Sequence, residues 1–287
     1  KSTQKITRAM QMVAASKLRR AQEAVESSRP YSERMENVLI SVSANIQSSD
    51  GQANLLTGNG RKDTYLLVVA TSERGLCGGF NSSIVRKVRV DIDLLTKEGK
   101  TIKILCIGKK GRDILRRDFS DLILDTIDLG DVKNISYTDV VPISKKIIEY
   151  FNNNEFDICN FYFNKFVSVI VQDVQTNQLI PASLNISKDD SSNDLNSTSQ
   201  IGDAVYEFEP EEDEILEFLL PKNLSVQLFQ GLLENSASEQ GARMTAMDNA
   251  TRNAGEMIDE LTLSYNRTRQ AVITSELIEI ISGAEAL

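Results

Sequence analysis

Apolar side chains recur at steps of three and four residues through the first 46 residues, which places them on one face of a helix. The segment has no glycine and a single proline, Pro30, which we expect to kink or restart the helix. Turn residues at 48–59 then predict a linker. The predicted apolar face consists of Ile6, Met10, Val13, Ala14, Leu18, Ala21 and Val25, continued by Met35, Val38, Leu39, Val42 and Ile46.

The segment from Leu224 to Ile281 also predicts one long helix, because it contains no proline. At about 1.5 Å per residue such a helix extends roughly 80 to 90 Å, more than a small domain can bury. Its apolar and small residues alternate in steps of three and four, the spacing of a coiled-coil seam. The alternative, an ordinary amphipathic helix on a globular core, is disfavoured by the length. The predicted seam is Met244, Met247, Thr251, Ala254, Ile258, Leu261, Tyr265, Thr268 and Val272.

Between these helices, short apolar runs alternate with helical periods. The predicted strands are TYLLVVAT (64–71), KILCIG (103–108), ICNFYFNKF (158–166) and VSVIVQDV (167–174), and the predicted helices span 82–97, 112–116 and 138–152. Strands alternating with helices indicate a parallel or mixed sheet that is covered on both faces.

The predicted fold class is therefore α/β, with two parts. The N- and C-terminal helices, within 1–50 and 210–287, form a long antiparallel coiled coil. Residues 60–208 form an inserted Rossmann-like domain with a mainly parallel sheet. An acidic, Ser- and Asn-rich stretch at 187–199 predicts a mobile loop.

Composition excludes several kinds of chemistry. The chain has 287 residues and no histidine, which excludes imidazole bases, Ser-His and Cys-His pairs and most zinc sites. Cys77, Cys106 and Cys159 are widely spaced, so neither a disulfide framework nor a metal site is indicated, and a reducing compartment is expected. No apolar run is long enough to span a membrane and no signal peptide opens the chain, so we expect a soluble protein.

The net charge of −9 argues against a nucleic-acid partner, but the charge is unevenly distributed. The first twenty residues carry a basic stripe without any acid: Lys1, Lys5, Arg8, Lys17, Arg19 and Arg20. An acidic block at 203–214 precedes the last helix. The basic stripe is either a solvated helix face or a contact for an acidic partner. A solvated helix usually carries pairs of opposite charge four residues apart, and we expect no acid within four residues of these basic residues, so the partner is favoured.

Two glycine-containing turns follow predicted strands, SERGLCGGFN at 72–81 and GKKGRD at 108–113. This is where α/β proteins often bind phosphate. Neither turn completes a GxxxxGK[ST] or GxGxxG motif, so we interpret both as tight turns and keep a nucleotide site as the alternative. Cys77 lies in the first turn and is expected to be accessible, whereas Cys106 and Cys159 are expected in the core.

The C-terminal stretch ELIEIISGAEAL is apolar on nearly all sides. A free helix end of this kind would be an exposed apolar patch unless something encloses it. We expect it to lie in an apolar sleeve of a partner protein.

Three stretches together resemble the gamma subunit of rotary, F-type ATP synthases of the bacterial type. They are TQKITRAMQMVAASKLRRAQ, SERGLCGGFN and ASEQGARMTAMDNATRNAGEMIDELTLSYNRTRQAVITSELIEIISGA. The resemblance covers essentially the whole chain. It departs at the start, where family members have further residues before the position of Lys1, so a processed or truncated chain is expected. The acidic balance also departs, and the regulatory cysteine pair of the chloroplast version has no counterpart.

The resemblance implies a central shaft that is not an enzyme and has no cofactor or metal of its own. Its implied partners are three alpha and three beta subunits in a ring around the helix pair, and the epsilon subunit and the c-subunit ring at the foot. Ion flow turns the rotor, and the shaft drives the ring to make ATP from ADP and phosphate. The implied location is the cytoplasmic face of the bacterial plasma (inner) membrane, reached only through the complex.

The resemblance also implies contact residues. Arg8, Met10, Lys17, Arg19 and Arg20 would lie near an acidic loop of the beta subunits, and Cys77 would lie in a second surface near them. The upper polar contacts of the ring would be Glu239, Arg243, Gln270 and Thr274, and the apolar bearing would include Ile281 and Leu287. Tyr206, Glu207 and Glu209 would contact epsilon and the c ring.

Two other functions stay open from the residues alone. One is an α/β ligand-binding module that its coiled coil merely dimerises, and the other is an enzyme. The lack of histidine and of any completed motif disfavours the enzyme. Tight ATP binding by the isolated chain through the 72–79 turn would favour the binding module.

Overall fold

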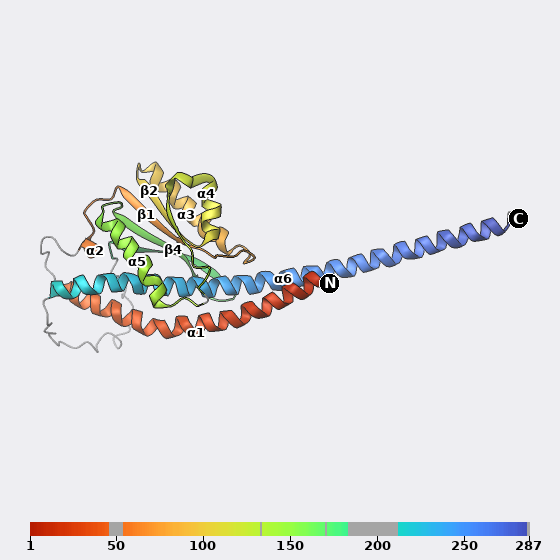
Figure 1. The fold of residues 1–287 in the computed structure, drawn as a ribbon, viewed down its shortest axis with the longest axis horizontal. Coiled ribbons are helices and arrows are strands. Elements are labelled where there is room, and N and C mark those ends of the chain that lie inside the picture. Colours follow the sequence, from red (N-terminus) through yellow and green to blue (C-terminus); the bar gives the residue numbers. More distant parts are fainter. Residues whose placement is uncertain (46–53, 133, 170, 183–211, 286–287) are drawn as a thin grey trace, which may run out of the picture.

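Two long helices from the ends of the chain lie side by side and antiparallel, with an α/β domain packed along one of them (Figure 1). A computed structural model describes residues 1–45, 54–132, 134–169, 171–182 and 212–285. Helix α1 spans Ser2–Asn45 and helix α6 spans Glu212–Glu285. The predicted α/β fold with a coiled coil of the terminal helices is confirmed.

The face of α1 that meets α6 follows a regular heptad spacing. The positions are buried or half-buried at alternating steps of three and four: Gln4, Thr7, Gln11, Ala14, Leu18, Ala21, Val25, Ser28, Ser32, Met35 and Leu39. We call the end of the helix pair near Asn45 the lower end and the end near Ser2 the upper end. At the lower end, Met35 and Leu39 pack on Leu216 and Leu220. At the upper end the seam becomes polar, so the two helices are held by apolar packing below and by hydrogen bonds above.

These upper hydrogen bonds are specific. The Gln11 side chain donates to Asp248 Oδ1 at 3.0 Å, and the Thr251 hydroxyl donates to Thr7 Oγ1 at 2.7 Å. Ile6 and Val13, predicted on the paired face, instead point outward and are 59% and 57% exposed. The spacing of apolar residues alone could not separate the face of α1 that meets α6 from the outward face. The reason is that the paired face includes many small and polar residues.

The described strands of the domain form one five-stranded sheet in the order β3-β2-β1-β4-β5. Strands β1 and β2 are parallel, as are β1 and β4, and β2 and β3, whereas β5 is antiparallel to β4. The bounds are β1 Thr64–Ala70, β2 Thr101–Ile107, β3 Ile123–Ile127, β4 Ile158–Phe166 and β5 Gln172–Ile180. The sheet is therefore mainly parallel, as predicted.

Helices cover both faces of this sheet. On one face, α3 (Phe80–Lys97) and α4 (Lys109–Phe119) enclose a core that includes Leu67, Ile84 and Cys106. On the other face, α5 (Tyr137–Asn152) and α6 enclose a second core that includes Phe161. The lower part of α6 is thus one helix of the coiled coil and also one layer of the α/β domain.

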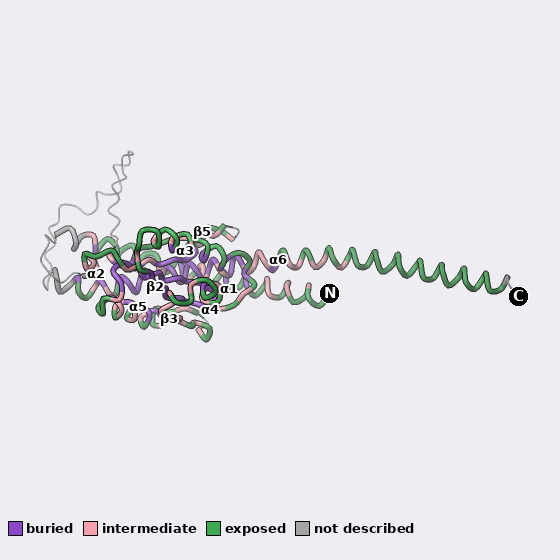
Figure 2. The backbone as a smooth tube through the Cα atoms, turned by 90° about the horizontal axis from the view of Figure 1, so that it is seen from above, coloured by how far each residue is buried: buried purple, intermediate pink, exposed green. Residues whose placement is uncertain are grey.

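The upper part of α6 projects alone. Helix α1 begins beside Gly255, where the Gln4 side chain would lie 3.1 Å from an added Cβ. Every residue from 259 to 284 is exposed (Figure 2). The predicted seam beyond Ile258 therefore has no partner among the described residues of this chain.

Several predicted boundaries were wrong. Helix α1 continues through Pro30, although Figure 1 shows that it bows. Part of the predicted linker is the short helix α2, Asn54–Thr57. Strand β5 begins at Gln172, because Val167 and Val171 lie exposed at the turn after β4. Strand β3 carries no long apolar run and was not predicted. The acidic loop at 187–199 lies outside the described residues.

Candidate functional site

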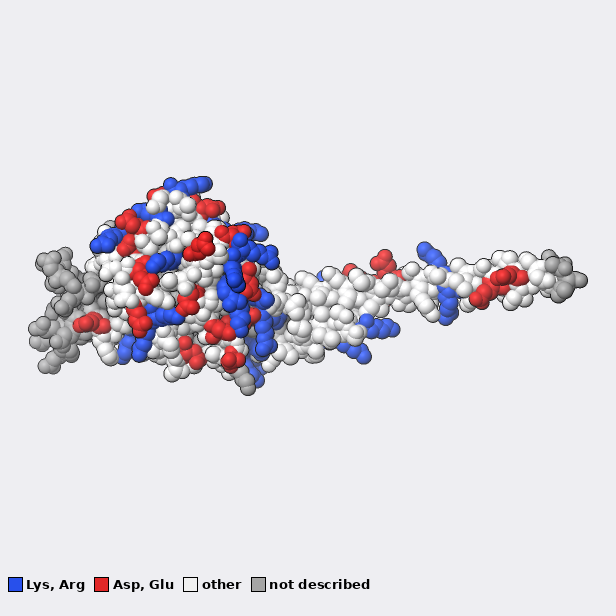
Figure 3. Space-filling model, turned by 45° about the horizontal axis from the view of Figure 1, so that its top comes forward, with Lys and Arg blue, Asp and Glu red and all other residues white. Residues whose placement is uncertain are grey.

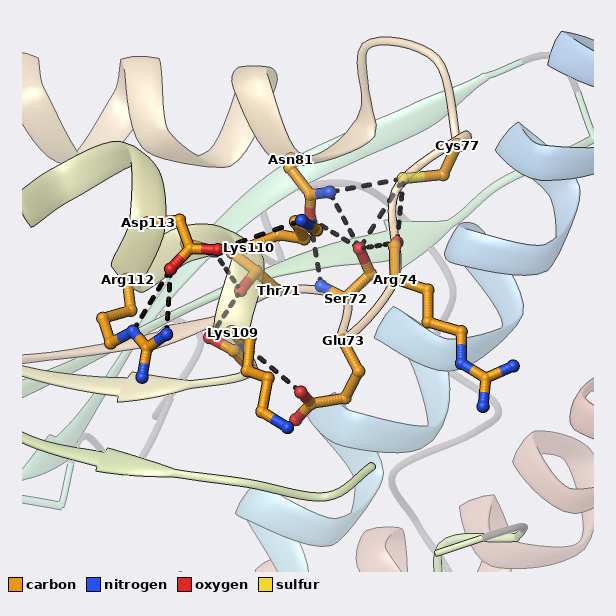
Figure 4. A network of polar contacts seen from close by, with 12 residues as sticks. Thr71, Ser72, Glu73, Arg74, Cys77, Asn81, Lys109, Lys110, Arg112 and Asp113 are labelled. Atoms are coloured by element: carbon orange, nitrogen blue, oxygen red, sulfur yellow. Dashed lines mark hydrogen bonds and ion pairs between the residues drawn. The ribbon is translucent and has the colours of Figure 1, made fainter. Parts of the chain in front are cut away.

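The loop that follows β1 is ordered by its own polar side chains (Figure 4). The backbone N–H of Ser72 donates to Asn81 Oδ1 at 3.0 Å, and the Asn81 amide donates to Ser72 Oγ at 2.8 Å and to Cys77 Sγ at 3.3 Å. The Ser72 hydroxyl also lies 2.7 Å from the Arg74 carbonyl. Because Asn81 lies in the first turn of α3, these bonds fix the loop to the start of that helix.

The place where a phosphate would bind is occupied by a carboxylate of this chain. Glu73 Oε2 accepts from the backbone N–H of Lys109 at the N-terminus of α4, at 3.2 Å. Its other oxygen accepts from Leu129 N at 2.8 Å. An acidic group is favourable at a helix N-terminus, so Glu73 fills the role that a bound anion would have. This arrangement supports the interpretation of both glycine turns as structural.

Glycine is needed where α4 approaches the loop. Gly108 has φ +98°, and a Cβ there would lie 2.3 Å from the Thr71 carbonyl oxygen. A Cβ on Gly111 would lie 2.7 Å from Thr71 Oγ1, which accepts from the Gly111 N–H at 2.9 Å. The absence of a side chain at both positions therefore lets the start of α4 lie against the end of β1, where the Gly111 hydrogen bond holds it.

The prediction of an accessible thiol at Cys77 was wrong. The side chain of this residue is 2% exposed, whereas the turn position predicted an accessible thiol. Burial raises the pKa of the Cys77 thiol, and the hydrogen bond from Ser72 acts in the opposite direction. The exposed residue of the turn is its neighbour Leu76, which is 64% exposed and has φ +64°. Leu76 and Cys77 both lie between Gly75 and Gly78, so no local pattern in the sequence separates the exposed side chain from the buried one.

Helix α6 pins this loop from the other side. Arg243 donates to the carbonyl oxygens of Arg74 and Gly75 at 3.2 and 3.3 Å, and its guanidinium pairs with Glu239 at 2.6 Å. Burial raises the pKa of Glu239, although the positive charges of Arg243 and Lys17 oppose this shift. The loop, α1 and α6 therefore meet in one charged cluster at the upper edge of the domain.

The described residues offer no site for a metal and no membrane span. No group of three or more acidic or cysteine side chains among them could hold a metal ion. None of the described helices is long and apolar enough to cross a membrane.

The sequence matches the family model described as ATP synthase over residues 1–287. A relative named ATP synthase gamma chain from Jannaschia sp. (strain CCS1) is 56% identical over 287 residues, which is 100% of this chain and 95% of the relative. The chain belongs to the ATP synthase gamma-chain family. A gamma chain from Sinorhizobium medicae (strain WSM419) is 55% identical with the same coverage.

Solved structures share the gamma-chain architecture. A chain from the central stalk and c ring of Tetrahymena thermophila mitochondrial ATP synthase has a TM-score of 0.62 and 26% identity, and the match covers 86% of this chain and 99% of that chain. A chain from Euglena gracilis mitochondrial ATP synthase has a TM-score of 0.59 and 19% identity, with 95% of each chain covered, and shows the fold alone.

The basic residues expected as gamma-chain contacts lie along the outside of α1. Arg8, Lys17, Arg19 and Arg20 are all exposed, and Met10 is half-buried near them. The expectation that no acid lies within four residues was wrong, because Arg19 pairs with Glu23 at 3.1 Å. Both side chains of this pair are highly exposed, so the ion pair is weak and Arg19 stays accessible to solvent.

The contact residues expected on α6 fall into two groups. Glu239 and Arg243 are largely covered by the domain of this chain, at 17% and 13% side-chain exposure. Gln270, Thr274 and Ile281 lie on the projecting part and are exposed. Figure 3 shows that uncharged side chains cover most of the visible face of this projection. Leu287 and the lower contacts Tyr206, Glu207 and Glu209 lie outside the described residues.

Proposed function

We propose that this chain is the central rotor shaft of an F-type ATP synthase. In this role the chain transmits rotation, driven by a transmembrane ion gradient, to a catalytic ring of three alpha and three beta subunits. It has no active site and needs no cofactor. Chemistry on ADP, phosphate and ATP takes place on the ring.

One observation carries the proposal: α6 continues unbroken past the last residue it pairs with, and all its side chains are exposed there. Residues 259–284 add about 40 Å of helix at 1.5 Å per residue. Leu261, Leu263, Ile273, Leu277 and Ile280 are each at least half exposed. An isolated helix with this much apolar surface needs a partner that surrounds it, and a closed ring is such a partner.

Coupling requires that the shaft contact different states of the ring unequally, because a ligand with equal affinity for all states shifts no equilibrium. An asymmetric shaft supports such unequal contacts, and the two sides of this helix pair differ beside the 72–79 loop. The basic stripe of α1 lies on one side of the helix pair, and the exposed Leu76 lies on the domain side.

Contacts on a turning shaft must also be weak at every angle. Exposed ion pairs contribute about 0 to 1 kcal/mol each, which suits Arg8, Lys17 and Arg20 facing an acidic loop of beta. Gln270 and Thr274 would add polar contacts higher up, and Ile281 to Leu287 would turn in an apolar bearing. Arg243 and Glu239 would contribute mainly by holding the 72–79 loop in place.

At the lower end, we propose contacts with the epsilon subunit and the c ring through Tyr206, Glu207 and Glu209. The complex would place the chain at the cytoplasmic face of the bacterial inner membrane. The α/β domain, residues 60–208, would form the foot of the shaft, with 1–50 and 210–287 as the coiled coil above and beside it.

Co-purification tests this function. Tagged chain should recover alpha and beta subunits from membranes of its source cells, and immobilised rings reconstituted with it should rotate a label on the chain when ATP is added. Failure to recover alpha and beta, or tight ATP binding by the isolated chain, would contradict the proposal.

A further inference from the structure

Strand β4 extends beyond its neighbour β1. The last paired residues are Val69 of β1 and Tyr162 of β4, whereas β4 continues to Phe166. Beyond Tyr162 its backbone groups on that side have no strand to pair with. Unpaired buried backbone groups are costly, so something else must satisfy them.

Three side chains of α6 take the place of the missing strand. Asn235 Oδ1 accepts from the Asn164 N–H at 3.1 Å, and the Ser238 hydroxyl donates to the Asn164 carbonyl at 3.0 Å. Glu234 Oε2 accepts from the Phe166 N–H at 2.9 Å. We call these three α6 residues and their two β4 partners the strand joint.

The strand joint also reaches the other helix of the shaft. Arg29 of α1 donates to Glu234 Oε1 at 3.3 Å, so one carboxylate links α1, α6 and β4. Glu234, Asn235 and Ser238 are at most 4% exposed, and Asn164 is fully buried. Hydrogen bonds are electrostatically stronger in such surroundings than in water.

Close backbone packing flanks the strand joint above and below. A Cβ on Gly231 would lie 2.3 Å from the Phe161 ring of β4. A Cβ on Gly241 would lie 3.3 Å from the Phe166 ring, and the Thr245 hydroxyl donates to the Val169 carbonyl at 3.3 Å. The small residues bring α6 near enough to the strand for short side chains to reach its backbone.

We propose that the strand joint is the element that transmits torque between the α/β domain and the two-helix shaft. Apolar attraction is non-directional, whereas hydrogen bonds weaken steeply when their angle changes. Three directional bonds between one face of α6 and one strand therefore resist rotation of the helix against the sheet. This inference rests on the proposed rotor function, and it names the positioning residues of that function.

A rotation assay with a bead on the domain tests the strand joint. The bead is attached through Leu94→Cys, an exposed position on α3, in a complex held by its beta subunits. The width of the bead's angular fluctuation during pauses reports the torsional stiffness between ring and domain. In the double variant Asn235→Ala with Ser238→Ala, two of the three bonds to β4 are lost, so we expect the variance to rise about two- to threefold.

Ser136→Ala is the matched control. Ser136 caps α5 on the surface of the same domain, and its substitution also removes a hydroxyl with hydrogen-bond partners, but these partners are Thr138 and Asp139 and not residues of α6. A general softening of the domain would raise the variance in this control as well. We expect the control to match the unmodified complex.

Hydrogen exchange on the full chain shows that the bonds have been removed. The amide of Asn164 should exchange about 5-fold faster in the double variant, as expected for the loss of one hydrogen bond. If the double variant does not assemble, Ser238→Ala alone removes one bond and should give a smaller rise in variance.

Two results would overturn the inference. One is unchanged variance in a variant whose Asn164 amide exchanges faster, and the other is an equal rise in the Ser136→Ala control. Failure of the proposed function looks different, because the bead on the unmodified chain would then not rotate with ATP at all.

Discussion

The lower and upper parts of α6 have similar helical sequences and opposite surroundings. Between residues 216 and 247 nearly every position is buried or half-buried, against α1 on one side and the sheet on the other. Between 259 and 284 every position is exposed, although leucine and isoleucine are as common there. The lower part is thus a core element of this chain, whereas the upper part has a similar share of leucine and isoleucine and no partner among the described residues of this chain.

The difference also shows in the small residues. In the lower part, Gly231, Ser238 and Gly241 lie against β4, where a larger side chain would collide with the sheet. In the upper part, Gly283 has open space around it. Packing within this chain therefore requires small residues in the lower part of α6, whereas it does not require a small residue at Gly283 in the upper part.

The largest expected difference is between two leucines. Leu228→Ala removes a fully buried side chain of the α6 core and should lower the free energy of unfolding by about 2 to 5 kcal/mol. Leu261→Ala, at 63% exposure, should change it by less than about 0.5 kcal/mol. Urea denaturation of the isolated chain measures both. Equal losses would mean that the upper part packs on this chain in solution.

Two glycines give a second contrast. Gly231→Ala places a Cβ against the ring of Phe161, which is stacked on Phe163 in the core and has little room to move. We expect a loss of about 1 to 3 kcal/mol in the free energy of unfolding from this overpacking. Gly283→Ala should leave the unfolding energy unchanged and raise the helical circular dichroism slightly, since alanine favours helices. A neutral Gly231→Ala would show that α6 is less tightly packed on β4 than the structure indicates.

The elements that sequence analysis predicted well are those that bury a whole face. Strands β1, β2 and β4 are rich in apolar residues, and most of the length of α6 follows from the lack of proline after Leu224, although the helix begins earlier and continues through Pro221. Strands β3 and β5 lie at the two edges of the sheet and carry polar residues, so their apolar pattern is weak. Val167 and Val171 are apolar but lie exposed at the turn between β4 and β5.

The site was harder to predict because its contacts join distant segments. No local pattern indicates that Arg243 reaches the 72–79 loop, or that Glu73 occupies the N-terminus of α4. The burial of Cys77 follows from Asn81 and Ser72, which turn the thiol inward. The resemblance predicts which residues contact the ring, but only the three-dimensional arrangement separates the covered pair, Glu239 and Arg243, from the exposed Gln270 and Thr274.

Two buried carboxylates should give opposite pH dependences. The pKa of Glu239 is raised by burial, so the folded chain holds this proton more tightly than the unfolded chain does. Unmodified chain should therefore lose stability relative to Glu239→Gln as pH rises from 4.5, by at most about 1.4 kcal/mol per pH unit.

The pKa of Asp157 is lowered even though burial acts to raise it, because its carboxylate accepts hydrogen bonds from Asn59 and from the backbone of Asp63 and Thr64. Relative to Asp157→Asn, unmodified chain should keep its advantage above pH 3.8 and lose it as pH falls below that value. Urea unfolding across pH measures both differences. Slopes of the same sign would contradict either the burial of Glu239 or the hydrogen bonds of Asp157.

Only a small effect on the stability of the chain itself is expected from the basic stripe. Reversing Lys17, Arg19 and Arg20 to glutamate should change the free energy of unfolding by less than about 0.5 kcal/mol per residue, because all three are exposed. In the reconstituted complex the same change should weaken ATP-driven proton pumping. Pumping at the unmodified level would make the stripe a solvated face only.

The central claim is that the projecting part of α6 is enclosed by other subunits, and cysteine labelling tests it most directly. Leu277→Cys places a thiol on the bare helix at a position 54% exposed, whereas the natural Cys77, Cys106 and Cys159 are buried. A maleimide should label this thiol rapidly in the isolated chain and many times more slowly once alpha and beta subunits have assembled around it. Equal labelling rates in the two states would contradict the claim.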